Sequence, residues 1–237
     1  LRTVTGVQTC ALPICTTSNL FSTSWSSSNL AFVENMFRGL LGRDANTTNG
    51  EATWWANLLS SGYTRSTITS WILNSTEYLG LQVDSTFKSI LGRTTSSSSE
   101  KTYWIGQFQG GMSYETFAIS LLTSNEFTTS HSTSSSFVTS LFEIVLGRDP
   151  GTSEASYWQT YAASSRSYVA TCIVKSSESY TLAVKSLFVQ FLHRSTSSSS
   201  ELSYWVGAAS SWGLNAVVNS LVSSSEFLTK SQNATGW

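Results

Sequence analysis

Charged residues are scarce in this 237-residue chain. They make up 11% of the sequence, against roughly 25% in an average globular protein. The 13 basic and 14 acidic residues give a net charge of −1, so we expect no surface for nucleic acid. Serine and threonine take the place of the missing charges, which favours an exported protein over a cytosolic enzyme. No apolar run reaches 18 residues, so we predict no membrane-spanning segment.

Histidine is also scarce, with two residues in the chain. Few side chains are therefore available for the acid–base catalysis that histidine commonly performs. His131 lies in a Ser/Thr-rich segment, and His193 occupies a place where related segments carry glycine. A catalytic serine needs a strained turn and an oriented histidine, and no such motif surrounds either histidine. Asp84 and Glu115 belong to no group of carboxylates of the kind that glycosidases use. We therefore predict no enzyme activity and no cofactor.

The three cysteines indicate neither a metal site nor a redox pair. Cys10 and Cys15 fit no strong motif spacing. Cys172 lies among apolar residues of a predicted helix, where a buried free thiol is expected. Proline occurs only as Pro13 and Pro150, and no alternation of polar and apolar residues competes with the helical patterns.

The N-terminal end is predicted not to belong to the natural protein. Residues 4–14, VTGVQTCALPI, look like the in-frame translation of a widely used short-read sequencing adapter. We therefore expect residues 1–15 to be a sequencing artefact on a metagenomic fragment, and they do not enter the fold prediction. Residues 16–31 are rich in serine and threonine and are predicted to be a lead-in or linker.

An internal repeat organises the remaining chain. The phrase SSSSEKTYW at residues 96–104 returns as SSSSELSYW at 197–205. The tryptophan that ends it occurs four times at spacings of 49, 54 and 47 residues, with an arginine ten to twelve residues before it and a glutamate 20 to 22 after it. These landmarks predict units of about 48 residues, at 32–80, 83–128, 136–181 and 183–228. The signature residues are Arg43, Arg93, Arg148, Arg194, Trp55, Trp104, Trp158, Trp205, Glu77, Glu126, Glu178 and Glu226.

Each unit is predicted to contain three helices. Apolar residues from Val33 to Leu41 recur at helical spacing until Gly42, a residue suited to end a helix. A capping box should start the second helix, and the third should run from Ile68 to Tyr78. The fold class is therefore all-α, a tandem array of four three-helix repeats with a shared core. The capping boxes pair Thr48 with Glu51, Ser97 with Glu100 and Ser198 with Glu201, and the other third helices span 117–127 and 217–227.

Two recurrent groups allow more than one interpretation. The arginine and the terminal glutamate of each unit form either a ligand-binding charge pair or a bridge from the end of the first helix to the end of the third, and we favour the bridge. The paired aromatic residues at the start of each second helix are predicted to point into the core. These pairs are Trp54-Trp55, Tyr103-Trp104, Tyr157-Trp158 and Tyr204-Trp205.

Features of single units have their own alternatives. The loop 44–51, DANTTNGE, is rich enough in oxygen to suggest calcium, but its spacing favours a turn that starts a helix. Trp71 and Trp212 could bind sugar because most units lack them, although core packing is favoured.

The unit resembles the bacterial domain-of-unknown-function 4214 repeat. That pattern is an apolar helix ending Leu-Gly-Arg, a polar turn, an aromatic-Trp pair and a final Ser-x-Glu-aromatic. The chain departs from it at His193, at the displaced third ending 176–180, and at the glutamate four residues before each tryptophan. The matching residues are Leu41-Gly42-Arg43, Leu91-Gly92-Arg93 and Leu146-Gly147-Arg148, with the endings Ser75 to Tyr78, Ser124 to Phe127 and Ser224 to Phe227.

The resemblance implies a role in structure or adhesion. Members of that family resemble modules of secreted and surface-layer bacterial proteins, and the unit is distantly similar to the helical linker domains of phycobilisomes. We predict a non-catalytic structural or adhesive module, extracellular or at the cell surface, with an unknown protein or a cell-surface glycan as its partner. The alternatives are an intracellular assembly linker, or an appendage of an exported enzyme whose catalytic domain is missing.

Overall fold

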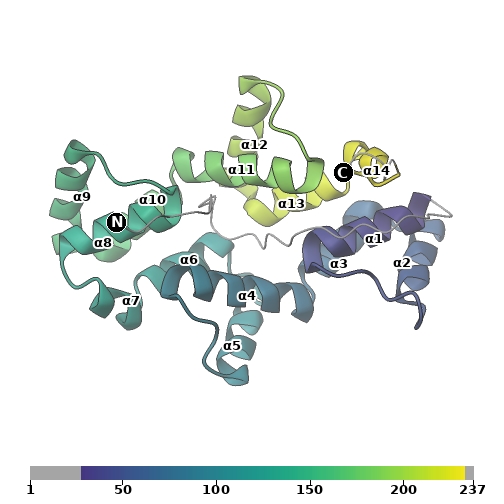
Figure 1. The fold of residues 1–237 in the computed structure, drawn as a ribbon, viewed down its shortest axis with the longest axis horizontal. Coiled ribbons are helices and arrows are strands. Elements are labelled where there is room, and N and C mark those ends of the chain that lie inside the picture. The colour runs from purple at the N-terminus through teal and green to yellow at the C-terminus, as the bar shows by residue number, and fades with distance from the viewer. Residues whose placement is uncertain (1–27, 233–237) are drawn as a thin grey trace, which may run out of the picture.

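The structure, a computed structural model, describes residues 28–232, with side chains to residue 230 (Figure 1). Regular secondary structure within that range is entirely helical, so the predicted all-α class is confirmed. The predicted artefact at 1–15 and most of the predicted linker at 16–31 lie outside it. The described helices are α1 (Ser28–Leu41), α2 (Glu51–Ser60), α3 (Arg65–Leu73), α4 (Thr76–Leu91), α5 (Ser98–Gln109), α6 (Tyr114–Leu122), α7 (Asn125–Ser130), α8 (Ser134–Leu146), α9 (Thr152–Ser164), α10 (Arg166–Val174), α11 (Ser177–Leu192), α12 (Ser199–Trp212), α13 (Leu214–Val222) and α14 (Ser225–Gln232).

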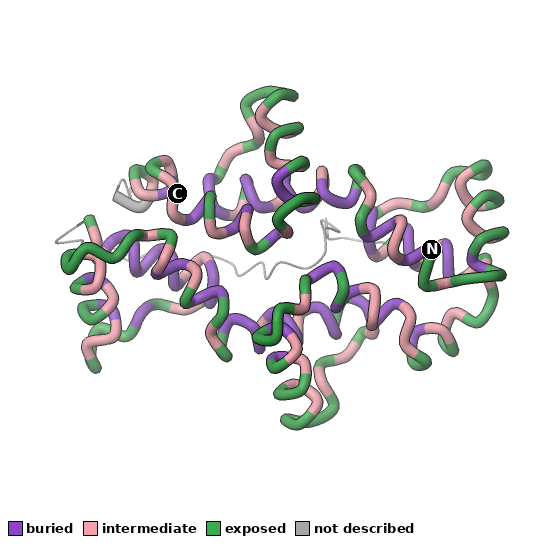
Figure 2. Tube along the Cα trace, turned by 180° about the vertical axis from the view of Figure 1, so that it is seen from behind, coloured by how far each residue is buried: buried purple, intermediate pink, exposed green. Residues whose placement is uncertain are grey.

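The core follows the long helices α1, α4, α8 and α11 and the shorter helices α3, α6, α10 and α13 that pack against them. Their apolar residues recur every three to four positions, so each helix presents one apolar face. Figure 2 shows the burial concentrated along the middle of the molecule. The side chains form one continuous cluster, dominated by the fully buried Phe32, Phe37, Phe87, Phe117, Phe127, Phe137, Phe142, Phe188 and Phe191.

The remaining long helices, α2, α5, α9 and α12, project from the body at four places (Figure 1). They bury few residues: Ala52 and Ala56 in α2, Ile105 and Phe108 in α5, Ala162 in α9, and Ala208 and Ala209 in α12. Each also packs one half-buried tryptophan against the core, so burial of apolar area supplies only part of what positions these helices. Contacts near their first turns must hold them against the body.

The third helices are shorter than predicted. Helices α3, α6 and α13 end at Leu73, Leu122 and Val222, so the predicted spans 68–78, 117–127 and 217–227 are wrong at their C-terminal ends. The Ser-x-Glu-aromatic ending instead starts the next helix. The hydroxyl of Ser75, for example, accepts the N–H of Tyr78 at 3.1 Å. Serine prefers this N-cap position because its oxygen satisfies an amide that has no partner within the helix.

That ending joins successive predicted units in two ways. In α4 and α11 the helix that begins with it runs on without a break as the first helix of the next unit. The predicted boundaries at 81–82 and 182 therefore lie inside helices. After the second predicted unit, two separate helices, α7 and α8, take the place of one continuous helix. The rings of Phe127 in α7 and Phe137 in α8 meet edge to face, with centroids 6.0 Å apart.

The fourth unit makes a similar junction with the first. Helix α14 packs along α1, and Phe227 meets Phe32 edge to face, again at 6.0 Å. Helix α3 packs on α13, as α6 packs on α10. Arg65 at the start of α3 donates to the carbonyl of Ser223 at 3.1 Å. The first and last units are thus neighbours in space, a contact that a tandem order by itself does not predict (Figure 1).

The predicted helix starts are partly confirmed. Ser97 and Ser198 cap α5 and α12 as predicted, each accepting the N–H three residues ahead at 3.1 Å. Thr48 does not cap α2, which begins after Gly50. The side-chain oxygen of Asn46 accepts the N–H groups of Thr48 and Asn49 and folds that loop into a turn of its own.

The predicted helix ends are confirmed. Gly42, Gly92 and Gly147 have φ of 67°, 70° and 68°, and His193 takes the same place with φ 48°. A Cβ atom in this left-handed region costs about 1–2 kcal/mol. Glycine avoids that cost, and His193 does not.

We therefore expect Gly92→Ala to lower the free energy of unfolding by about 1 kcal/mol. A Cβ at this position meets no atom within 4 Å, so the effect is conformational. His193→Gly should raise the stability by a similar amount. Gly106→Ala is the matched control, because Gly106 is helical and its Cβ also meets no atom within 4 Å. Urea denaturation monitored by circular dichroism measures all three, and a loss of stability in the Gly106 variant equal to that at Gly92 would contradict the explanation.

Candidate functional site

The signature arginines lie at the end of each first helix, where each contacts two glutamates. Arg148 donates from Nε and Nη2 to the carboxylate of Glu178, at 2.6 and 2.9 Å. It donates from Nη1 and Nη2 to Glu154, at 2.8 and 2.9 Å, and from Nη1 to the carbonyl of Asp149 at 3.1 Å. All five N–H donors of this guanidinium thus have acceptors. We call such an arginine and its two glutamates an arginine cluster.

The other three signature arginines make the same five hydrogen bonds. In every cluster Nε and Nη2 donate to the terminal glutamate of the Ser-x-Glu-aromatic ending. The two Nη atoms donate to the glutamate in the first turn of the projecting helix. The donor–acceptor distances lie between 2.5 and 3.5 Å. The clusters are Arg43 with Glu51 and Glu77, Arg93 with Glu100 and Glu126, and Arg194 with Glu201 and Glu226.

An aromatic layer lies under each guanidinium. Arg93 sits over the ring of Phe87, 5.0 Å from its centroid, and Phe87 meets Trp104 edge to face at 6.3 Å. The ring gives the cation a favourable electrostatic contact and a fixed surface. The corresponding phenylalanines are Phe37, Phe142 and Phe188. The sequence analysis missed this residue, although it stands six positions before every signature arginine.

The second glutamate of each cluster corrects the predicted bridge. Glu51, Glu100 and Glu201 were predicted to complete capping boxes, but they accept the N–H groups of Asn46, Ser96 and Ser197 rather than those of the predicted caps, and each pairs with the arginine. The terminal glutamates lie in the first turn of a following helix, so the arginine does not reach the end of the third helix as predicted. Each cluster joins one helix C-terminus to two helix N-termini. Helix dipoles favour this arrangement of charges at all three ends.

The clusters change the acidity of their carboxyl groups. The Arg148 guanidinium and the N–H of Gly151 lower the pKa of Glu154 to about 2. The Arg194 guanidinium lowers the pKa of Glu201 to about 2, against the opposing effect of burial. Hydrogen bonds from the arginines also lower the pKa values of Glu51, Glu126, Glu178 and Glu226. These carboxylates therefore remain ionised well below neutral pH.

The aromatic pairs divide between the core and the surface. Trp55, Trp104, Trp158 and Trp205 are half-buried and pack against the core. Their preceding partners, Trp54, Tyr103, Tyr157 and Tyr204, are exposed, so the prediction that both members point inward is wrong. Consecutive helical residues point about 100° apart, so one face cannot bury both. Trp71 and Trp212 are also exposed, against the favoured core packing.

Most other polar candidates are engaged in local contacts. In the loop 44–51, Asn49 accepts the N–H of Glu51 at 3.1 Å, which makes the loop a turn before α2. Asp84 pairs with Lys101 at 2.6 Å. The ring of His131 stacks on Phe127, with centroids 4.2 Å apart. Cys172 is a free thiol and is only half-buried, less than predicted.

The described part of the chain contains neither a helix suited to span a membrane nor a group of side chains suited to hold a metal ion. Between residues 28 and 232 no helix combines the length and the apolar character that crossing a bilayer requires. Over the same residues no three His, Cys, Asp or Glu side chains are grouped closely enough to hold a metal ion.

Comparison with known proteins adds the family. A family model described as a domain of unknown function (DUF4214) matches residues 14–82 and 118–183, more than half of the chain. The chain belongs to the DUF4214 family. No curated protein and no solved structure matches it. The DUF4214 matches contain the Arg43 and Arg148 clusters complete, whereas Arg93 and Arg194 lie outside them with the same geometry.

Removing one arginine tests the role of a cluster. Arg148→Ala leaves Glu154 and Glu178 facing each other without their shared cation, and we expect a loss of about 1–3 kcal/mol in the free energy of unfolding. Arg148→Lys should restore only part of it, because an ammonium group cannot make two bidentate contacts. Lys175→Ala, at an exposed basic residue, is the control and should stay within about 0.5 kcal/mol of wild type. Unchanged stability of Arg148→Ala in chemical denaturation would refute the structural role.

The lowered carboxyl pKa values predict acid sensitivity. Carboxylates with a folded pKa below the unfolded value of about 4.5 stabilise the fold fully above that value. This contribution is lost as the pH falls from about 4.5 through the folded pKa of about 2 of Glu154 and Glu201. Melting temperatures should therefore be steady from pH 7 to about 5 and then decline.

The variant Glu154→Gln provides the control for this titration. It should melt below wild type at pH 6, and the difference should shrink as the pH approaches 2, where about half of the wild-type carboxyl groups are protonated. A difference of the same size at pH 6 and pH 2 would show that charge on Glu154 is not the cause.

Proposed function

We propose that the chain is a non-catalytic structural or adhesive module of a secreted or surface-layer bacterial protein. The observation that supports this most directly is the saturation of the arginine clusters. Every N–H donor of the four signature arginines has an acceptor within the molecule. The polar residues that recur in the sequence thus hold helices together and have no free donor for a substrate.

The proposal includes four three-helix units of about 48 residues. Four arginine clusters of the same geometry support this division, as do the four projecting helices in Figure 1. A rigid body with several similar projecting elements suits a scaffold, because it can present the same surface in several directions.

Composition supports the proposed location. The surface relies on Ser and Thr, and only 11% of the residues are charged. Neutral hydroxyl-rich surfaces have no electrostatic attraction for nucleic acids or anionic lipids. We accordingly place the module outside the cell or on its surface, where its partner is a protein or a glycan. An intracellular assembly linker is the alternative.

Fractionation of the producing bacterium tests this location. An antiserum raised against residues 28–232 should detect the protein in the envelope fraction or the medium. Antibody labelling of intact cells should then agree with the envelope signal, with a cytosolic enzyme as the control for lysis. Detection confined to the cytosol would reject the surface role and support the intracellular linker.

A further inference from the structure

Each projecting helix presents one exposed aromatic ring near its first turn. Trp54, Tyr103, Tyr157 and Tyr204 are 56%, 58%, 53% and 61% exposed. The half-buried tryptophan that follows each of them holds it edge to face, with ring centroids 4.7 to 5.2 Å apart. One side of each exposed ring is thereby supported, and the rest is open to solvent. We call these four rings the platforms.

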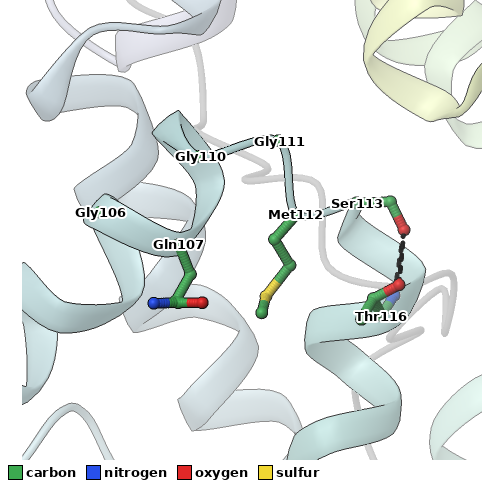
Figure 3. Close-up of a pocket in the computed structure, with 7 residues that line it drawn as sticks. All are labelled: Gly106, Gln107, Gly110, Gly111, Met112, Ser113 and Thr116. Carbon is green, nitrogen blue, oxygen red and sulfur yellow. Dashed lines mark hydrogen bonds between the residues drawn. The ribbon is translucent and has the colours of Figure 1, made fainter.

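A shallow hollow lies between the C-terminal half of α5, the helix that carries Tyr103, and the start of α6 (Figure 3). Gly106 and Gln107 line it from α5, three and four residues after Tyr103 and therefore on the same helical face, and Gly110 lines it from the C-cap of that helix. Met112, Ser113 and Thr116 line the opposite side, with the two hydroxyl oxygens 3.0 Å apart. The space is open and measures about 490 Å³. Its polar groups are one amide and two hydroxyls, all neutral.

The first and third units carry more rings at the corresponding place. In the third unit Tyr157 contacts Tyr161 at 4.9 Å, and Tyr161 contacts Tyr168 at 5.6 Å. In the first unit Trp71 and Tyr63 lie 5.3 Å apart. All of these added rings are exposed. Tyr161 and Tyr168 thus extend the platform of α9, and Trp71 joins the half-buried Trp55 of α2 at 6.3 Å. Helices α2 and α9 lie at opposite ends of the molecule (Figure 1).

We propose that the platforms bind neutral polysaccharide by stacking on the apolar faces of its sugar rings. An exposed aromatic ring offers a flat apolar surface at low cost in conformational entropy. The amide and hydroxyls of the hollow can bond the hydroxyl groups at the sugar's edge. This assignment rests on the proposed adhesive role and names its partner.

The arrangement of the platforms favours a polymer over a folded protein. They stand on four helices that project in different directions (Figure 1). A stable protein interface gathers about 800 Å² on one continuous surface of each partner, and no single surface collects all four platforms. Polysaccharide chains can reach each platform separately. Several weak stacking contacts then add to a high overall affinity.

Affinity electrophoresis in native gels tests the proposal. Separate gels contain soluble β-glucan, mannan or xylan, and one contains no polysaccharide. Wild-type protein should be retarded by at least one of the three. The variant with Trp54, Tyr103, Tyr157 and Tyr204 all changed to Ala should lose this retardation, a decrease in apparent affinity of about tenfold or more.

Two further variants serve as controls. Val189→Ala removes a large exposed apolar side chain on α11, a helix that carries no platform, and should be retarded like wild type. Tyr103→Phe keeps the ring and loses its hydroxyl, and should also bind. Circular dichroism verifies that each variant is folded. The platform side chains are more than half exposed, so their removal should leave the fold intact.

Three results would overturn the proposal. They are no retardation of wild type in any of the three gels, equal retardation of the fourfold variant, and a wild-type dimer in sedimentation that the fourfold variant turns into a monomer. The last would identify the platforms as contacts with a second copy of the chain. Surface location without retardation rejects the polysaccharide partner alone, whereas cytosolic location rejects the proposed function whatever the gels show.

Discussion

One guanidinium group joins three helix ends in each arginine cluster, and the position of each projecting helix depends on it. Arg148 follows the C-terminus of α8, and its two glutamates lie in the first turns of α9 and α11. A helix has partial negative charge at its C-terminus and partial positive charge at its N-terminus. The ion pairs and the helix dipoles therefore act together, so that one arginine and two glutamates stabilise the contact between three helix ends.

Two neighbouring residues prepare this contact. Gly147 takes a left-handed conformation that ends α8 and turns the chain, and Phe142 supplies the ring on which the guanidinium lies. The projecting helix is then held mainly near its first turn. Since α9 buries only Ala162, most of its surface is available for other purposes, and exposed aromatic rings can occur there without disturbing the core.

Local patterns in the sequence predicted the helices, the caps at Ser97 and Ser198, and the pairing of arginine with the terminal glutamate. The C-terminal ends of the third helices could not be predicted, because the helical spacing of apolar residues continues across Ser75. The hydrogen bond from the N–H of Tyr78 to the Ser75 hydroxyl starts a new helix there, and the spacing of apolar residues does not reveal it. The role of Glu154 as a partner of Arg148 depends on tertiary geometry, which capping rules do not contain. The prediction that Tyr157 and Trp158 both point into the core was wrong, because Tyr157 is exposed. Helix geometry alone could have excluded it, since the side chains of adjacent helical residues point in different directions.

Helix α4 takes part in two clusters, because its first turn carries Glu77 for Arg43 and its C-terminus leads directly to Arg93. A segment cut at the predicted repeat boundary, after residue 80, would keep the Arg43 cluster complete but would divide α4, so that the first turn and the C-terminus of one helix fall in different segments. Cooperative unfolding must therefore extend over at least two units. The boundary of the predicted sequence unit and the boundary of the helix therefore do not coincide, and α4 serves both neighbouring units.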